Sequence, residues 1–567
     1  MRASIDQNNF QSDNLCDEIM PIHDISTVLR GFGFEVLAIN GHDPHEISSA
    51  WKTATTADHR KSYVILAKTT KAGGTNLLKP STHPETGLLY HPWHTKVPKW
   101  DLYIKVIEEQ IRHSRLEALD NAFKKHKAVR FRGDQVYTLP NTHRPVYKSY
   151  EIGTGKAFGR YLVKCLKSPQ HEKHKDIAIV DADLATSCGI NGAVNHAGYY
   201  EVGISEQDAI SFAAGLALAG KRPVVNTYSN FLKRGFENIF ISVIEGANVI
   251  MAGHYSGLCY HTDGKSHQSF DDLGVFSALS PKLLVVDPVT PRQAEMFLEK
   301  CFALDRPVYF RLRRTPDPGM FKRIDSTLGL NDGWEMPLLF NTHFDLGDLK
   351  GKKVRRSVPS QDPNSPPLFV TIGTVATRLA FDCIDQEDCF KHSPIAVVSV
   401  LNLQQPNEGS NTEVDLVWAT LFKNHRHVIV IEDDPGALYK FVCSRIVEVC
   451  SSNVDVREQI GAVSPPLRVI SKNVPGHGPS QRTLKACLQY FGFTVDSIKE
   501  LFFNDHFDGS VVASASNKKG SGATYAEKLQ HMDKIERRLA MAEKNVASGG
   551  TVAEDSPNPS PSKKRKR

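Results

Sequence analysis

A glutamate stands where a predicted strand gives way to a predicted helix. The stretch Gly198–Gly220 opens with a β-type run, turns at Gly203 and continues as small, mostly apolar residues that predict a buried helix. Glu206 lies at this junction. A helix N-terminus favours the ionised carboxylate, whereas burial raises its pKa. Taken alone, Glu206 is either the capping acid of a core helix, which is the commoner case, or a catalytic acid.

Three other stretches contain reactive or aromatic groups, and two of them follow predicted strands. Tyr228 and Phe231 stand three apart after a strand and could offer ring faces to a flat ligand, although such pairs more often belong to a core. The loop His254–Gln268 holds three histidines, including His267, together with Asp263, and this density favours function. His94 lies in a Pro/His-rich loop, which by itself indicates little.

The elements that must hold these residues form three α/β units. Helical and strand patterns alternate along residues 1 to about 125, in a unit whose ends look unfinished. From about 151 to 325, strands and helices alternate regularly, which predicts a doubly wound parallel sheet with its ligands beyond the carboxyl ends of the strands. A third unit follows a Pro/Asn/Asp-rich segment at about 330 to 365. Its Glu432-Asp433-Asp434 run is interpreted as a surface turn.

Composition describes an ordinary globular chain with a distinctive end. Its 567 residues are 40% hydrophobic and 23% charged, and no apolar run is long enough to cross a bilayer. The ten cysteines form no Cys-x-x-Cys pair, which favours a reducing compartment. Lys563–Arg567 supplies most of the formal charge of +6 and follows a Ser/Pro-rich segment of disordered character. We expect a cytoplasmic protein without a membrane or nucleic-acid partner for its body. The basic cluster is a nuclear-import signal, a nucleic-acid tether or a solubilising tail.

Together these motifs resemble the transketolase family of thiamine-diphosphate enzymes, from residue 1 to about 505. The run from Tyr199 to Gln207 is similar to the family's E-x-x-I-A-E-Q stretch, Asp263 to Gln268 resembles D-G-P-T-H-Q with lysine in place of proline, and Ala182 to Ser187 resembles A-D-L-T-P-S. The resemblance implies a partial diphosphate-binding domain (1–129), a linker (130–150), a pyrimidine-binding domain (151–325), a C-terminal domain (366–506) and a low-complexity tail (507–567).

The resemblance also implies roles for single residues. Glu206 would hydrogen-bond the aminopyrimidine of thiamine diphosphate, and Tyr228 and Phe231 would cradle that ring. The remaining roles, each carried over from a matching motif, are cofactor contact for Asp183, substrate contact for His94, Ser187, Asp263, His267 and Arg314, and binding of Mg2+ or Ca2+ by Asn8 and the backbone of Phe10.

The chemistry implied is transfer of a two-carbon ketol unit from a ketose to an aldose, as in pentose phosphate metabolism. Glu206 would promote formation of the cofactor's ylid, which adds to a ketose carbonyl and leaves an enamine that attacks the acceptor. His94 and His267 would handle protons of the sugar hydroxyls. Family members are dimers, so the resemblance implies a homodimer that acts on sugars or sugar phosphates.

Departures from the family pattern leave alternatives open. Gly155 stands where the family has an arginine that grips phosphate, and Tyr255 where it has a histidine. The family's Gly-Asp-Gly metal motif would precede Asn8 by about one βαβ unit, where this sequence has no residues. Either an upstream segment is missing from this sequence, or a separate chain supplies that half-domain, or the protein is an inactive relative. The alternatives are deoxyxylulose-phosphate synthase, the β subunit of a 2-oxoacid dehydrogenase, or an inactive regulatory relative. The Trp93-His94 pair ahead of the second unit favours transketolase over both other enzymes.

Overall fold

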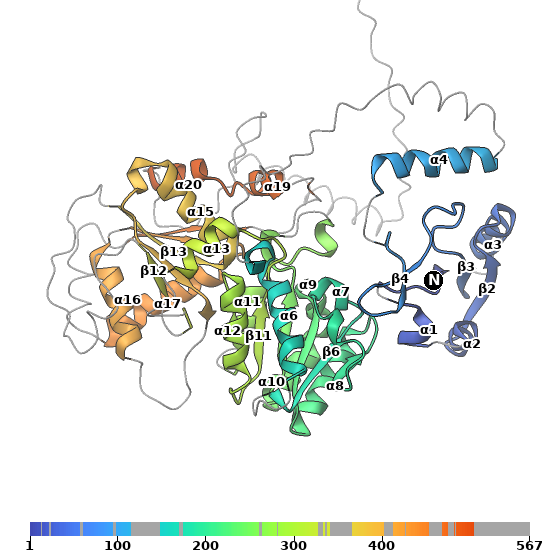
Figure 1. Ribbon diagram of the computed structural model, residues 1–567, viewed down its shortest axis with the longest axis horizontal. Helices are drawn as coiled ribbons and strands as arrows, with labels where there is room; N and C mark the ends of the chain where they lie inside the picture. Colours follow the sequence, from blue (N-terminus) through green and yellow to red (C-terminus); the bar gives the residue numbers. More distant parts are fainter. Residues whose placement is uncertain are drawn as a thin grey trace, which may run out of the picture. The chain divides into compact units, whose positions relative to one another are not determined.

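The structure is a computed structural model built around three sheets (Figure 1). It describes residues 1–114 and 148–503, with gaps at 13, 22–23, 57–59, 95–97, 169–173, 260–262, 280–281, 327–332, 335–336, 341–365, 402–411, 426, 453–467, 475–480 and 482–483. The C-terminal tail with Lys563–Arg567, and most of the predicted linker, lie outside the described residues. The predicted class, α/β units with mainly parallel sheets, is confirmed.

The first sheet has three parallel strands in the order β1-β3-β2. These strands are β1 (Arg2–Gln7), β2 (Phe34–Asn40) and β3 (Ser62–Lys68), and their helices are α1 (Cys16–Ile19), α2 (Ile25–Gly31), α3 (Pro44–Thr56) and α4 (Trp100–Ser114). A short hairpin, β4 (Ser81–Thr82) and β5 (Leu89–Tyr90), lies in the Pro/His-rich loop. Strand β1 is absent from the sequence-based prediction, because it is short and only Ala3 and Ile5 in it are apolar.

The second sheet has seven strands in the order β15-β10-β11-β9-β8-β6-β7. Its parallel strands are β6 (Ile177–Asp181), β7 (Tyr199–Glu201), β8 (Arg222–Tyr228), β9 (Ile250–His254), β10 (Leu284–Val286) and β11 (Val308–Arg311). The main helices are α6 (Thr154–Leu166), α8 (Glu206–Leu218), α10 (Phe236–Ile244), α12 (Pro291–Cys301) and α13 (Pro318–Asp325), with the shorter α7 (Ala185–Cys188), α9 (Ser229–Leu232) and α11 (Asp272–Ser277). The buried, uninterrupted apolar strands are typical of a parallel sheet covered on both faces.

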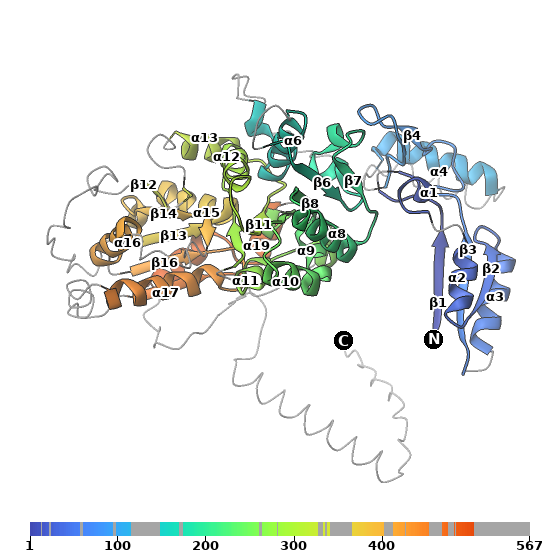
Figure 2. The same ribbon diagram turned by 90° about the horizontal axis from the view of Figure 1, so that it is seen from below.

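The third sheet has five strands in the order β12-β14-β13-β16-β17. They are β12 (Leu338–Phe340), β13 (Leu368–Ile372), β14 (Ile395–Val398), β16 (His427–Ile431) and β17 (Arg468–Lys472), with helices α15 (Gly373–Gln386), α16 (Thr412–Asn424), α17 (Ala437–Ser452), α19 (Leu484–Tyr490) and α20 (Val495–Phe503), several of which are labelled in Figure 2. Strand β12 falls inside the segment interpreted as a separator. Strand β15 (Val400–Leu401) leaves this unit and pairs antiparallel with β10.

A buried charge network joins the second and third units. Arg311 donates to Asp272 (3.0 Å), Asp287 (3.2 Å) and Asp433 (2.6 Å), and Arg313 donates to Asp287 and Asp433 at 3.0 Å each. All five side chains have no exposed surface. A side chain at Gly257 would overlap the Asp433 carboxylate, so glycine there permits the close approach.

The interpretation of Glu432-Asp433-Asp434 as a surface turn is wrong. The three residues are at most 1% exposed. Although burial acts to raise it, Arg311 and Arg313 lower the pKa of Asp433 to about 2. Burial raises the pKa of Asp434 to about 7, and burial with the charge of Asp434 raises the pKa of Glu432 to about 8. Of the three carboxylates, Asp433 is therefore the one that neutralises the arginines at neutral pH.

No helix among the described residues is both long and apolar enough to cross a membrane.

We predict that Asp433→Ala lowers the free energy of unfolding by about 3–5 kcal/mol, because it leaves two buried guanidinium groups short of a counter-charge. Urea-induced unfolding measures the change. Asp385→Ala is the matched control, because Asp385 pairs with Arg323 on the surface, with 54% and 39% of the two side chains exposed, and its loss should cost less than about 1 kcal/mol. Equal effects of the two substitutions would contradict a special role for the buried network.

Candidate functional site

An aromatic cluster forms where β8 and β9 end. The rings of Tyr228 and Tyr255 are stacked, with centroids 4.4 Å apart and planes at 27°. Phe231 lies 5.2 Å from Tyr228, and His267 lies 5.8 Å from Tyr228 and 5.2 Å from Phe231. Three of these four residues were predicted from the sequence as site residues. Together they form one aromatic surface beyond the carboxyl ends of neighbouring parallel strands.

Local backbone geometry explains how Tyr255 reaches Tyr228. Strands β8 and β9 pair in parallel with Tyr228 opposite His254. The next residue, Tyr255, has a φ of 61°, which is uncommon for residues other than glycine. This turn redirects the chain at the strand end, so the Tyr255 ring lies on that of Tyr228. The sequence marked Tyr255 only as a departure from a family histidine and gave no sign of the stacking.

Polar groups border the aromatic cluster. The hydroxyls of Tyr228 and Tyr255 both hydrogen-bond with Ser187 in α7. The guanidinium of Arg314, just past β11, lies 5.2 Å from the centre of the Tyr255 ring. His267 Nδ1 is 2.8 Å from Ser266 Oγ, and Asp263 is exposed in the same loop. The structure thus brings Ser187, Arg314 and His267 to the border of one aromatic surface.

Asp183 lies just past the end of β6, next to β8 in the sheet. It is buried, with a φ of 60°, and its backbone N–H donates to Glu201 Oε1 at 2.9 Å. Its carboxylate accepts from the backbone N–H of Ser12 in the first unit. Burial raises the pKa of Glu201, whose carboxylate also accepts from the Tyr199 hydroxyl. Positive φ at a non-glycine residue marks a constrained position, of the kind that clusters at functional sites.

Glu206 is the first residue of α8 and is 2% exposed. The N-cap residue of α8, Ser205, makes no side-chain cap bond, and Glu206 Oε2 has no hydrogen-bond partner among the described residues. Arg234, whose side chain is 60% exposed, comes within 3.6 Å of this oxygen. Burial with one oxygen unsatisfied argues against a merely structural capping role. The sequence gave no signal for the approach of Arg234.

A second group of predicted residues lies in the first unit. The ring of His94 pairs with the Lys71 ammonium. Desolvation and the Lys71 charge lower the pKa of His94, so the imidazole is mostly neutral at pH 7. Asn8 Oδ1 accepts from the backbone N–H of Phe10 at 3.0 Å, and the Phe10 ring packs edge-on against His91. The described contacts of His94 are with this unit and not with the aromatic cluster.

Comparison with known proteins identifies the middle unit. Residues 151–316 match the family described as transketolase, pyrimidine binding domain. The middle unit is therefore a transketolase-type pyrimidine-binding domain.

Individual relatives cover the chain unevenly. The 1-deoxy-D-xylulose-5-phosphate synthase of Lachnoclostridium phytofermentans is 34% identical over 164 residues, which is 28% of this chain and 25% of that protein. The chain thus spans about a quarter of the length of such curated relatives. A solved transketolase from Campylobacter jejuni is 16% identical, with a TM-score of 0.42, over 88% of this chain and 72% of that one. A split-gene transketolase, described as an inactive β4 tetramer, is 20% identical, with a TM-score of 0.42, over 62% of this chain and 97% of that one.

The transketolase-like domain departs from the family pattern at the N-terminus of α6. Gly155 N–H donates to the carbonyl of Arg313 at 3.0 Å. A Cβ at this position would lie 2.9 Å from His254 Nδ1 and 3.3 Å from the Arg313 carbonyl oxygen. The helix therefore packs so closely on the end of β11 that no arginine side chain fits here without displacing His254. The absence of a side chain at Gly155 permits this close packing.

His254 itself was not predicted as a site residue. It is fully buried, its Nε2 lies 3.4 Å from Asn226 Oδ1, and its Nδ1 has no hydrogen-bond partner among the described residues. Burial lowers the pKa of His254 to about 3, so it is neutral at physiological pH. In this transketolase-like domain it fills the space beside Gly155 as an uncharged ring.

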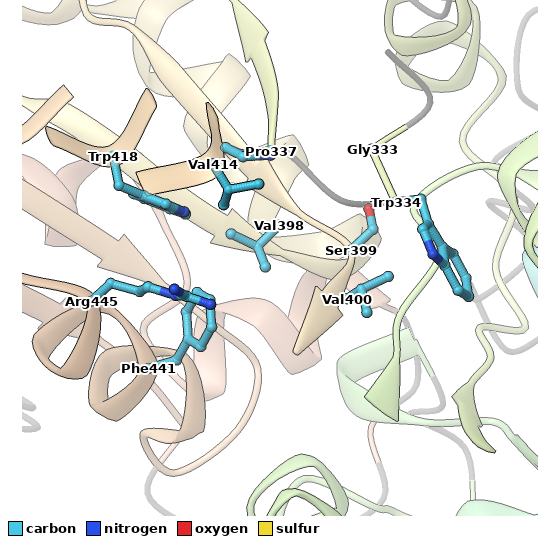
Figure 3. A pocket seen from close by; sticks show the side chains of 10 residues that line it. All are labelled: Gly333, Trp334, Pro337, Val398, Ser399, Val400, Val414, Trp418, Phe441 and Arg445. Carbon is cyan, nitrogen blue, oxygen red and sulfur yellow. The ribbon is translucent and has the colours of Figure 1, made fainter. Parts of the chain in front are cut away.

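Two pockets lie away from these residues. One, bordered by Trp334, Trp418, Phe441 and Arg445, opens between the second and third sheets (Figure 3). The other lies beside the Asp317–Arg378 ion pair and is lined partly by α19. Neither contains a predicted site residue, so neither enters the transketolase-like site.

We predict that Gly155→Ala lowers the free energy of unfolding by about 1–3 kcal/mol, because the methyl group would press on His254 and the Arg313 carbonyl. Gly215→Ala is the matched control. Gly215 lies inside α8 with open space where its Cβ would point, so alanine there should stabilise by about 0.5–1 kcal/mol. Chemical denaturation of the two variants measures both changes. An unchanged free energy of unfolding in Gly155→Ala would show that the start of α6 can shift to accept a methyl group, and would contradict the tight packing.

Proposed function

We propose that this protein transfers a two-carbon ketol unit from a ketose to an aldose with thiamine diphosphate as its cofactor. The observation that carries the proposal is the Glu206 carboxylate. It is buried at a helix N-terminus with one oxygen unsatisfied. A donor from a ligand would satisfy this oxygen.

The chain's residues fit the pyrimidine half of that cofactor. Tyr228 and Phe231 provide the ring faces on which a flat heterocycle would pack. Glu206 Oε2 would accept a hydrogen bond from the pyrimidine and hold its proton. Thiamine diphosphate, when bound, supplies a carbon nucleophile and an electron sink for cleavage next to a carbonyl. Asp183 would add a further polar contact to the cofactor.

Substrate contacts follow from the groups around the aromatic cluster. Ser187 and Arg314 are the groups able to bind a sugar phosphate, because a hydroxyl and a guanidinium both donate to phosphate oxygens. Without an arginine at position 155, fewer groups are able to bind a phosphate. We therefore propose both sugars and sugar phosphates as substrates. Asp263 would hydrogen-bond sugar hydroxyls. His267, and a mostly neutral His94, would move protons of those hydroxyls.

The proposed metal is Mg2+ or Ca2+, bound by oxygen ligands from the first unit. The Asn8 side-chain carbonyl and the backbone carbonyl of Phe10 are the candidates on this chain, since both metals prefer oxygen. Two neutral oxygens make a weak site alone. Further ligands would come from the diphosphate.

A second candidate is formation of 1-deoxy-D-xylulose 5-phosphate. It is favoured by the identity of about a third between the middle unit and synthases of that name. The Trp93-His94 loop is the feature that ranks ketol transfer above it. Assaying both reactions separates the two candidates: sugars lengthened or shortened by two carbons indicate ketol transfer, and deoxyxylulose phosphate indicates the synthase.

We predict that Glu206→Gln lowers ketol transfer by about 10²- to 10⁴-fold, because the amide cannot hold the pyrimidine proton as the carboxylate does. Asp208→Asn is the matched control: Asp208 lies in the same helical turn but is exposed, so its activity should stay near that of the wild type. Sugar products are quantified by mass spectrometry, and cofactor binding by calorimetry with Mg2+. If the wild type neither binds thiamine diphosphate nor converts any ketose, the protein is an inactive relative.

We also propose that the chain self-associates through α8 and α10. These neighbouring helices expose six large apolar side chains, between 38% and 70% exposed: Ile204, just ahead of α8, then Phe212, Leu218, Phe240, Ile241 and Ile244. An apolar patch of this kind favours an interface. A second copy of this chain is the proposed occupant, and a separate chain supplying the remaining half-domain is the alternative.

We predict that the purified chain is a dimer at micromolar concentration in analytical ultracentrifugation, and that Ile241→Glu shifts it to the monomer. Ile241 is 52% exposed on α10, so a glutamate costs little in the monomer but would be desolvated in the interface. Trp51→Glu is the matched control, because Trp51 is 57% exposed and belongs to α3 and not to α8 or α10. A wild-type monomer would contradict self-association.

A further inference from the structure

A sulfur, a nitrogen and an oxygen ligand meet near the amino-terminal end of β6, whereas the aromatic cluster lies beyond the carboxyl ends of β8 and β9. Cys165 Sγ, a ring nitrogen of His174 and a carboxylate oxygen of Glu299 all lie within 4.8 Å of one another. His174 Nε2 is 2.9 Å from Glu299 Oε2. We call these three residues the Cys165 triad. The proposed function uses none of them.

Three elements bring the triad together. Cys165 lies in the last turn of α6, Glu299 near the end of α12, and His174 just ahead of β6. Helices α6 and α12 lie side by side (Figures 1 and 2). Because β6 runs from the triad towards Asp183, one strand of about 17 Å separates the triad from this proposed cofactor-binding residue.

The setting is partly enclosed and suited to a metal. Cys165 is 2% exposed and His174 8%, whereas the Glu299 side chain is 28% exposed and leaves a route to solvent. The Phe302 ring packs edge-on against His174 at 5.6 Å and shields one side. The Tyr161 hydroxyl donates to Glu299 Oε2 at 3.2 Å, in the position of an outer partner that orients a ligand.

The mixture of donors selects the metal. In a tetrahedral zinc site, bond lengths of about 2.0–2.3 Å place ligand atoms about 3.3–3.8 Å apart. The triad's ligand atoms already lie within 4.8 Å of one another, close to these separations. Thiolate, imidazole and carboxylate together favour zinc over magnesium or calcium, which bind oxygen. Three protein ligands leave a fourth position for water.

We propose that Cys165, His174 and Glu299 bind one Zn2+ ion at a site separate from the cofactor site. Binding replaces the Cys165 S–H bond with an S–Zn bond and releases the proton to solvent. The ion would tie α6 and α12 to the start of β6. The alternative is a His174–Glu299 ion pair beside an inert buried thiol.

The test uses the full-length protein, stripped with a chelator and kept in excess Mg2+ so that oxygen-ligand sites are filled. Zinc affinity is measured by competition with a chromophoric chelator, and thiolate coordination by the charge-transfer absorption of added Co2+. We expect one zinc per chain, loss of the cobalt band in Cys165→Ser, and at least about a 100-fold loss of zinc affinity in Cys165→Ser and His174→Gln.

Cys301→Ser is the matched control, because Cys301 is a buried thiol two residues from Glu299 on α12 but outside the triad. It should keep both the cobalt band and the zinc affinity of the wild type. A wild type that binds no zinc, or a cobalt band that survives Cys165→Ser, would overturn the proposal. Thermal unfolding of each metal-free variant separates loss of zinc binding from loss of the fold.

Discussion

The structure of the proposed site depends on the buried pairing of Arg311 and Arg313 with aspartates from two units. Charges without exposed surface are tolerated only when their partners are held in place, because removing one partner leaves the other uncompensated. Strand β11 is therefore held at its carboxyl end by groups from the second and third sheets. The backbone of Arg313 in turn accepts from Gly155 and donates to Thr154, which fixes the start of α6. The guanidinium of the next residue, Arg314, lies over the ring of Tyr255.

This dependence explains which parts of the fold could be read from the sequence. Strands such as β6 and β11 are continuous apolar runs, so local pattern was sufficient to predict them. Strand β15 has two residues and exists only because it pairs with β10, far away in sequence. Asp433 lies 122 residues from Arg311. A run of three acids is usually solvated, so only the distant arginines make its burial favourable, and no local pattern carries that information.

The same division applies to the site. The grouping of Tyr228, Phe231 and His267 followed from their positions after strand ends, since parallel strands end at one edge. The stacking of Tyr255 on Tyr228 could not be predicted in this way, because it depends on a positive φ at Tyr255. Close packing at Gly155 was equally hidden: its sequence signal was the loss of an arginine, whereas its physical cause is contact with buried His254. Residue types were sufficient to predict which side chains could take part in chemistry, whereas tertiary packing decides which side chains fit together.

Glu206 shows how a cost in folding can become an advantage in binding. A buried polar oxygen without a partner costs about 1–3 kcal/mol. Arg234 offsets only part of this, because its guanidinium is 3.6 Å away and mostly in water. A residue selected only for capping would gain by reaching a backbone N–H of its own helix, as Thr290 does in α12. The unsatisfied oxygen therefore favours binding of any ligand that presents a hydrogen-bond donor at the start of α8. The hydrogen bond to that donor would offset the cost of burying the oxygen.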